Sequence, residues 1–220
     1  MLVRQLQDLL ARLYDAPSSH DVANFLITDS QQAAALQGRQ TVPAATDEQL
    51  LVAEGDDGVE LSLYVDAAVL QRLRERCPLR ELSAHNLADF CTALEGVSHF
   101  HYYVWNADRA RDVSLLDLEL QAEVDKYAAA LRLILAQREG RFPRELFRQL
   151  FDAADFLPDL TPVERERYGE AHHFAARFCR RLEERFMCGR RARPDALLQE
   201  LRRFYRLGRH AKLRHAQQWS

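Results

Sequence analysis

Acidic side chains gather around one of the chain's two lysines between residues 114 and 126. If this stretch is a helix, Glu119, Glu123 and Lys126 follow one another at i, i+4 and i+7 and share one face. Converging carboxylates bind hard cations, and a carboxylate pair can divide the acid and base roles of a reaction. These three residues are therefore the candidates for a catalytic centre. The alternative, which is the commoner arrangement, is a solvated helix face carrying i,i+3 and i,i+4 charge pairs.

Two histidines lie in the aromatic run Val97–Trp105, just before this acidic stretch. Aromatic and β-branched residues favour a strand, on which His99 and His101 point the same way, as ligands of zinc and copper often do. If the acidic helix packs on this strand, Glu95 and both histidines approach the carboxylates and complete a metal site. The alternative is that the histidines form ordinary hydrogen bonds beneath a helix.

A second candidate metal site is the pair Glu170 and His173. Glu-x-x-His is the ligand spacing of di-iron carboxylate bundles, because residues i and i+3 project from adjacent turns of a helix. Such sites need two of these motifs and two further glutamates, and this chain has one motif. The alternative is that both residues flank an apolar stripe that already accounts for the helix. The sequence identifies no cofactor, and a divalent metal ion is the candidate at either site.

The C-terminal region is basic, whereas the whole chain has a net charge of −3. Residues 189–220 contain nine arginines and lysines against two acidic residues. An acidic body with a basic tail indicates an electrostatic contact, either within the molecule or with a protein partner. Binding to nucleic-acid phosphates is the alternative, although a nucleic-acid binder is usually basic overall. The candidate residues for this contact are Arg190, Arg191, Arg202, Arg206 and Arg209.

Several function classes have no support in the sequence. There is no phosphate-binding glycine loop, no Gly-x-Ser-x-Gly and no His-Glu-x-x-His, which speaks against nucleotide-dependent chemistry and serine hydrolysis. The four cysteines form no Cys-x-x-Cys pair, and we expect free thiols. No stretch of 18 apolar residues indicates a membrane span, and the amphipathic start of the chain is unlike a signal peptide. We therefore expect a cytoplasmic bacterial protein with no membrane contact.

The elements that must position these residues follow from hydrophobic periodicity. In the first part of the chain, an Asp-Gly pair between two alternating runs predicts a hairpin turn at residues 55–58. The aromatic run should pair with this hairpin as a third, antiparallel strand. Asn86 should cap a short helix that Gly96 stops. The expected helices cover residues 2–14, 19–35, 67–76, 87–94 and 114–137, and the expected strands cover residues 49–54, 59–66 and 97–105.

From residue 138 onward the pattern is helical throughout. Thr161 and Glu164 form a capping box with proline at the first helical position, which predicts the start of a helix of about seven turns. A short aromatic helix should precede it, after Pro143. The last helix should run from Pro194 to about Leu213, with Arg202, Arg206 and Arg209 outward.

The predicted fold is α+β and predominantly helical, with a small three-stranded antiparallel sheet covered by helices and a C-terminal helical bundle after it. Three regions are expected: a helical arm and linker (1–46), an α+β core (47–138) and a helical region with a basic tail (139–220). The leading hypothesis is a non-catalytic adaptor or accessory subunit that binds other proteins. The first alternative is a metal-dependent hydrolase or nuclease that uses the acidic helix with His99. The second is nucleic-acid binding through the basic C-terminal helix.

Overall fold

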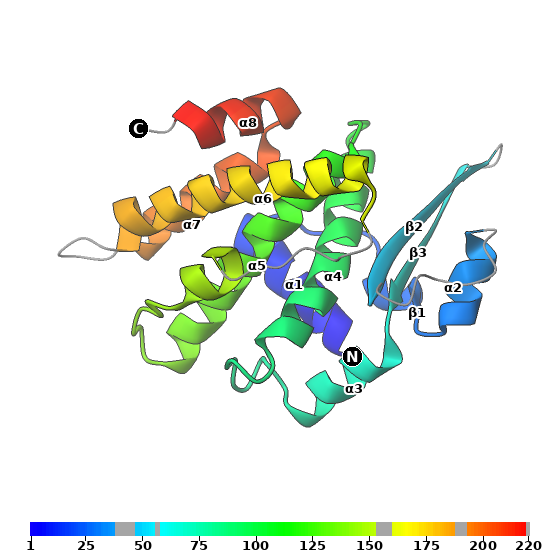
Figure 1. Cartoon of the computed structure of the whole chain (residues 1–220), viewed down its shortest axis with the longest axis horizontal. Coiled ribbons are helices and arrows are strands. Elements are labelled where there is room, and N and C mark those ends of the chain that lie inside the picture. Colours follow the sequence, from blue (N-terminus) through cyan, green and yellow to red (C-terminus); the bar gives the residue numbers. More distant parts are fainter. Residues whose placement is uncertain (38–46, 56–57, 153–159, 188–192, 219–220) are drawn as a thin grey trace.

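Two helices form the centre of this computed structural model, which describes residues 1–37, 47–55, 58–152, 160–187 and 193–218 (Figure 1). They are α4 (Leu87–Ala107) and α5 (Leu115–Gln137), and they pack along each other. Buried residues lie on all sides of both helices, which is typical of helices in the middle of a core. The other elements are arranged around this pair.

Helices from both ends of the chain cover the central pair. The first helix packs on α4, the sixth lies along α5, and the two C-terminal helices pack on the first and the sixth. In Figure 1 the sixth helix crosses in front of α5, and the last lies above it. These covering helices are α1 (Leu2–Tyr14), α6 (Pro162–Leu182), α7 (Pro194–Arg206) and α8 (Arg209–Gln218).

The sheet has three strands in the order β1-β3-β2. The predicted hairpin is confirmed: β2 (Glu48–Gly55) runs antiparallel to β3 (Gly58–Val65), and it projects from the helices at the upper right of Figure 1. The third strand is β1 (Leu26–Ile27), which pairs with β3 in parallel. The sheet is therefore mixed, and the prediction that it is antiparallel throughout was wrong.

The aromatic run at residues 97–105 is helical, and its prediction as a strand was wrong. It forms the second half of α4, and nearly all of its side chains are buried. The aromatic and β-branched preference for strands reflects packing against neighbours more than a backbone preference. A helix covered on every side offers the same packing, so these residues are accommodated without a strand.

The prediction that Gly96 ends a helix was wrong, because α4 continues through this residue. Gly96 instead allows the hairpin to approach α4 closely. A methyl group added at Gly96 would lie 2.8 Å from Cδ1 of Leu63 and 2.9 Å from Oε2 of Glu48. Both partners belong to the sheet, and β2 and β3 both pack against α4. The missing side chain thus lets the sheet, and with it Glu48, reach the surface of α4.

The predicted helix over residues 19–35 was wrong. Asp21 caps a single 3-10 turn (Val22–Asn24), the chain then extends through β1, and Asp29 caps the short helix α2 (Ser30–Leu36). Two capping aspartates eight residues apart each accept a hydrogen bond from a free backbone N–H, so two short elements form where one was expected.

Helix ends elsewhere follow the capping signals. Ser114 and Asp117 form the expected box at the start of α5, and Thr161 and Glu164 do the same for α6. The helix predicted at 67–76 is confirmed as α3 (Ala67–Glu75). Two π-helical turns follow α5 and α6, at Arg148–Asp152 and Glu183–Met187.

The last predicted helix divides in two. The chain leaves the helical conformation at Leu207 and Gly208, so that α8 turns back across α6 instead of continuing α7. This break inserts Lys212 into the interior, where its side chain is fully buried. The prediction of a single helix to Leu213 was therefore wrong, and it gave no sign that Lys212 is buried.

Buried residues from all three predicted regions belong to one hydrophobic cluster. The division at residues 46 and 138 stays a prediction. Among the described helices, none combines the length and the apolar character needed to cross a membrane. The described cysteines, Cys77, Cys91 and Cys179, are free thiols, and Cys188 lies outside the described residues.

Two glycines inside helices give a matched test of the close approach of the sheet. We expect Gly96→Ala to lower the free energy of unfolding by about 1 kcal/mol, because overpacking outweighs the gain in helix propensity. Gly169→Ala in α6 meets no atom within 4 Å, so it should stabilise the protein by up to about 1 kcal/mol. Urea unfolding of both variants measures the difference, and equal effects would contradict the role given to Gly96.

Candidate metal centre

Three side chains predicted as metal or catalytic residues come together between α4 and α5. Glu95 and His99 lie one turn apart on α4, and Glu119 faces them from α5. One ligand atom from each of these three residues lies within 4.8 Å of the other two. Nε2 of His99 is 3.5 Å from Oε2 of Glu119. Glu95 and His99 therefore lie beside the acidic helix, although a helix and not a strand carries them.

A third carboxylate reaches this group from the sheet. Glu48 is the first residue of β2, and its Oε2 is 3.8 Å from Nδ1 of His99. The sequence analysis missed Glu48, since nothing in its surroundings marks it as a ligand. The close approach allowed by Gly96 is the signal that could have pointed to it.

The group is buried and its hydrogen bonding is incomplete. His99 and Glu119 are each only 6% exposed. Within the described part of the chain, neither Nε2 of His99 nor Oε2 of Glu48 has a hydrogen-bond partner. Buried polar atoms are almost always hydrogen-bonded, so two such atoms on adjacent side chains need an explanation. Nε2 of His99 faces Oε2 of Glu119, whereas Glu48 lies on the Nδ1 side of the ring. A cation bound between His99 and Glu119 would therefore supply a partner for Nε2.

The predicted catalytic residues divide into two neighbouring groups. Glu119 faces His99, whereas Glu123 pairs with Lys126 and accepts a hydrogen bond of 3.0 Å from Nδ1 of His172. Lys126 connects the two groups, because its Nζ also lies 3.1 Å from Oε2 of Glu95. These side chains are mostly buried, so the solvated face considered in the sequence analysis is absent here.

Charge pairing determines the protonation of both groups. Burial alone would raise the pKa of Glu123, but Lys126 and His172 outweigh it and lower the pKa to about 2. Burial alone would lower the pKa of His99, yet the facing carboxylates of Glu119 and Glu48 hold it well above its usual value. Without a metal ion, a positively charged imidazole therefore offsets the repulsion between these carboxylates.

The donor set matches a transition-metal ion better than a hard cation. Carboxylate oxygens alone suit Mg²⁺ or Ca²⁺, whereas an imidazole nitrogen among carboxylates suits Mn²⁺, Fe²⁺ or Zn²⁺. The guanidinium of Arg167, from α6, lies 3.9 Å from Oε1 of Glu119 and balances part of the negative charge. The residues present can thus hold one divalent ion.

His101 does not take part, and the prediction that it shares a face with His99 was wrong. Two residues apart on a helix, the two side chains point to nearly opposite sides. His101 lies in an apolar environment, with its ring centre 6.3 Å from that of Tyr205. Burial lowers the pKa of His101 to about 4, so the imidazole is neutral near pH 7.

The Glu170 and His173 pair lies on an exposed face of α6. Within the described residues, no third potential ligand joins them. The interpretation of this motif as residues flanking an apolar stripe fits their position, since the neighbouring Phe174 and Ala171 are buried.

The arginines of the basic tail contact the body of the protein. Arg202 donates to the carbonyl oxygen of Leu13, and Arg206 donates to those of Tyr14 and Asp15, at 2.9 to 3.2 Å. These carbonyls end α1, where no further helical turn can satisfy them. Arg209 lies 3.4 Å from Asp117 at the start of α5. Arg190 and Arg191 lie outside the described residues.

A second buried polar group, which the sequence analysis missed, lies on the other side of α4 and α5. Asp125 accepts hydrogen bonds from Tyr14, from Ser98 at 2.6 Å and from Gln121 at 2.7 Å. Gln121 in turn accepts a hydrogen bond of 2.6 Å from the buried Lys212. Burial outweighs these donors and raises the pKa of Asp125 to about 6.

Comparison with protein-family models, with curated proteins and with solved structures found no match to this chain. The assignment of function therefore depends on the geometry alone.

The contact between Arg206 and α1 gives a prediction with a matched control. We expect Arg206→Ala to lower the free energy of unfolding by about 1 kcal/mol, because it leaves carbonyls at the end of α1 without their donor. Arg203→Ala removes an exposed arginine of the same helix and should change the free energy of unfolding by less than about 0.5 kcal/mol. Chemical denaturation of both variants measures the difference. Equal effects would mean that the contact between Arg206 and α1 does not contribute to stability.

Asp125 predicts a specific pH dependence of stability. Its pKa is about 6 in the folded protein and about 3.9 in an unfolded chain, so between these values the folded state binds more protons. The contribution of Asp125 to the free energy of unfolding is therefore fully present at low pH. It falls by about 3 kcal/mol as pH rises from 4 to above 6. Asp125→Asn cannot titrate, so the stability of the variant relative to wild type should rise across this range.

Urea unfolding at pH 4, 5, 6 and 7 measures this difference. Asp112→Asn, which removes an exposed carboxylate, controls for the loss of one charge. A constant difference between wild type and Asp125→Asn would show that Asp125 is ionised throughout.

Proposed function

We propose that this protein binds a divalent transition-metal ion through Glu95, His99 and Glu119. The observation that carries the proposal is the convergence of three ligand atoms within 4.8 Å around a buried imidazole nitrogen that makes no hydrogen bond in the described residues. The candidate ions are Mn²⁺, Fe²⁺ and Zn²⁺.

The geometry needs only small adjustments to accept such an ion. Ligand atoms about 2.0 to 2.2 Å from a zinc ion lie roughly 3 to 4 Å from one another. The 3.5 Å between His99 and Glu119 is already in this range. Glu95 must shift inward by a rotation of its side chain, which releases one of the two carboxylates that Lys126 contacts. Lys126 keeps Glu123 as its partner, so no charge is left unpaired.

A bound ion of this kind can act as a Lewis acid or generate a nucleophilic hydroxide, which is the chemistry of the hydrolase or nuclease alternative. Two contacts favour that alternative: Glu123 and His172 are hydrogen-bonded next to the centre, and Lys126 is positioned beside it. These three residues can move or hold a proton close to the metal ligands. Hydrolysis, its substrate and a cytoplasmic location stay predictions.

The adaptor hypothesis is a second candidate, favoured by the projecting hairpin. In the described residues β2 is an edge strand, and Val52 of β2 and Val59 of β3 are 43% and 51% exposed on the hairpin. An open strand edge suits a partner that adds an extended segment to the sheet. Nucleic-acid binding has less support, because Arg202 and Arg206 are engaged with α1.

Thermal unfolding with added metal tests the proposal. A ligand that binds only the folded state at 100 times its Kd stabilises by about 2.7 kcal/mol. For a chain of this size, Tm should rise by roughly 5 to 10 °C with at least one of Mn²⁺, Fe²⁺ or Zn²⁺. His99→Gln and Glu119→Gln should abolish this rise.

Exposed residues of the same types provide the control. Glu170→Gln and His173→Gln remove a carboxylate and an imidazole from the surface of α6, and both should retain the full rise in Tm. The proposal fails if no metal stabilises the wild type, or if the exposed and the buried variants respond alike. Metal content per chain after dialysis, expected to be one, checks the stoichiometry independently.

A further inference from the structure

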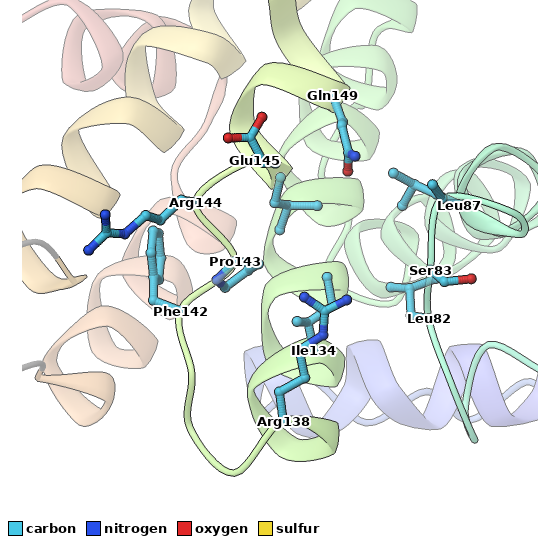
Figure 2. Close-up of a pocket in the computed structure, with 12 residues that line it drawn as sticks. Leu82, Ser83, Leu87, Ile134, Arg138, Phe142, Pro143, Arg144, Glu145 and Gln149 are labelled. Carbon is cyan, nitrogen blue, oxygen red and sulfur yellow. The ribbon is translucent and has the colours of Figure 1, made fainter.

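A cavity of about 360 Å³ lies at the far end of α5 from the metal centre (Figure 2). It is enclosed by the loop before α4, the last turn of α5 and the segment that follows α5. Its size is at the lower end of the range for small-molecule pockets. The walls are mostly apolar, and the side chains that form them are Leu82, Leu87, Ile134, Phe142, Pro143 and Leu146.

Hydrogen bonds hold the loop on one side of the cavity. The side chain of Gln137, at the end of α5, accepts from the backbone N–H of Leu82 and donates to the carbonyl of Pro78, both at 2.8 Å. Asn86 accepts from the N–H of Ser83 and donates to the carbonyl of Glu81. The loop is thus fixed to α5 and to itself, so the cavity is formed before any ligand enters.

One positive charge at this cavity is available to a ligand. Arg138, which directly follows α5, lines the cavity, and Figure 2 shows its side chain extending toward Ile134. In the described part of the chain its guanidinium has no hydrogen-bond or ion-pair partner. The acidic residue of the lining, Glu145, pairs instead with Arg148 at 2.6 Å. Arg144 points away from the cavity in the same view.

We propose that this cavity binds a small amphipathic carboxylate, with its apolar chain against the walls and its carboxylate on Arg138. A guanidinium presents two parallel N–H groups that match the two oxygens of a carboxylate, so it is the natural partner of this head group. The walls offer few partners to a polar chain, because Ser83 and Gln149 are the only uncharged polar residues among those that line this cavity. The ligand class is therefore a medium-chain fatty acid or a compound of similar shape.

This site is independent of the metal centre. Glu119 and Arg138 are 19 positions apart on α5, which corresponds to roughly 28 Å along the helix. Variants of one site should leave the other unchanged, so failure of either proposal can be recognised separately.

Calorimetric titration with octanoate tests the inference. We expect saturable binding of one octanoate per chain, weaker binding of octanol and no binding of acetate. Arg138→Gln should weaken octanoate binding about tenfold, the loss expected for one charge-assisted pair at a partly exposed site. Arg132→Gln, an exposed arginine on the same helix, should bind octanoate as the wild type does, and so should His99→Gln.

Two results would overturn the inference. Equal affinities of wild type and Arg138→Gln would show that Arg138 does not recognise the carboxylate. Absence of saturable binding below the concentration at which octanoate forms micelles would show that the cavity holds no such ligand.

Discussion

The structure depends on one constraint, the burial of α4 and α5 on nearly all sides. A helix pair without a solvent face must satisfy every polar side chain it carries from within the protein, since a buried polar group without a partner costs about 1 to 3 kcal/mol. Both helices carry many such groups, among them Glu119, Asp125, Ser98 and His99. The surrounding elements provide the partners.

Each covering element contributes polar atoms as well as apolar packing. Tyr14 of α1 and, through Gln121, Lys212 of α8 complete the group around Asp125. On the other side, Glu48 of β2 and His172 of α6 complete the groups around His99 and Glu123. The second group differs from the first in one respect: two of its buried atoms make no hydrogen bond. This difference is the reason to place a metal ion there and not beside Asp125.

Three signals that depend only on neighbouring residues predicted ends of elements correctly. The capping boxes at Ser114 and Thr161 and the hairpin around Gly55–Gly58 depend on neighbouring residues, and all three are present. The prediction of a strand over the aromatic run was wrong. Its residue types favour a strand when considered alone, but burial on all sides of α4 provides the same packing in a helix. Glu95, His99 and Glu119 could be proposed from their types and spacing. Glu48 and Lys212 could not be proposed in this way. Glu48 reaches His99 because Gly96 lets the sheet approach α4, and Lys212 is buried because the chain breaks at Leu207; both effects depend on tertiary packing.

The central claim is that the group around His99 is a metal site and not a buried network of ion pairs. A crystal structure of the protein grown with Mn²⁺ or Zn²⁺, with anomalous diffraction to locate the metal, tests it most directly. The claim predicts one anomalous peak about 2.0 to 2.3 Å from His99 Nε2 and from oxygens of Glu95 and Glu119. A map with no peak at this position, and with Lys126 still paired to Glu95, would contradict it.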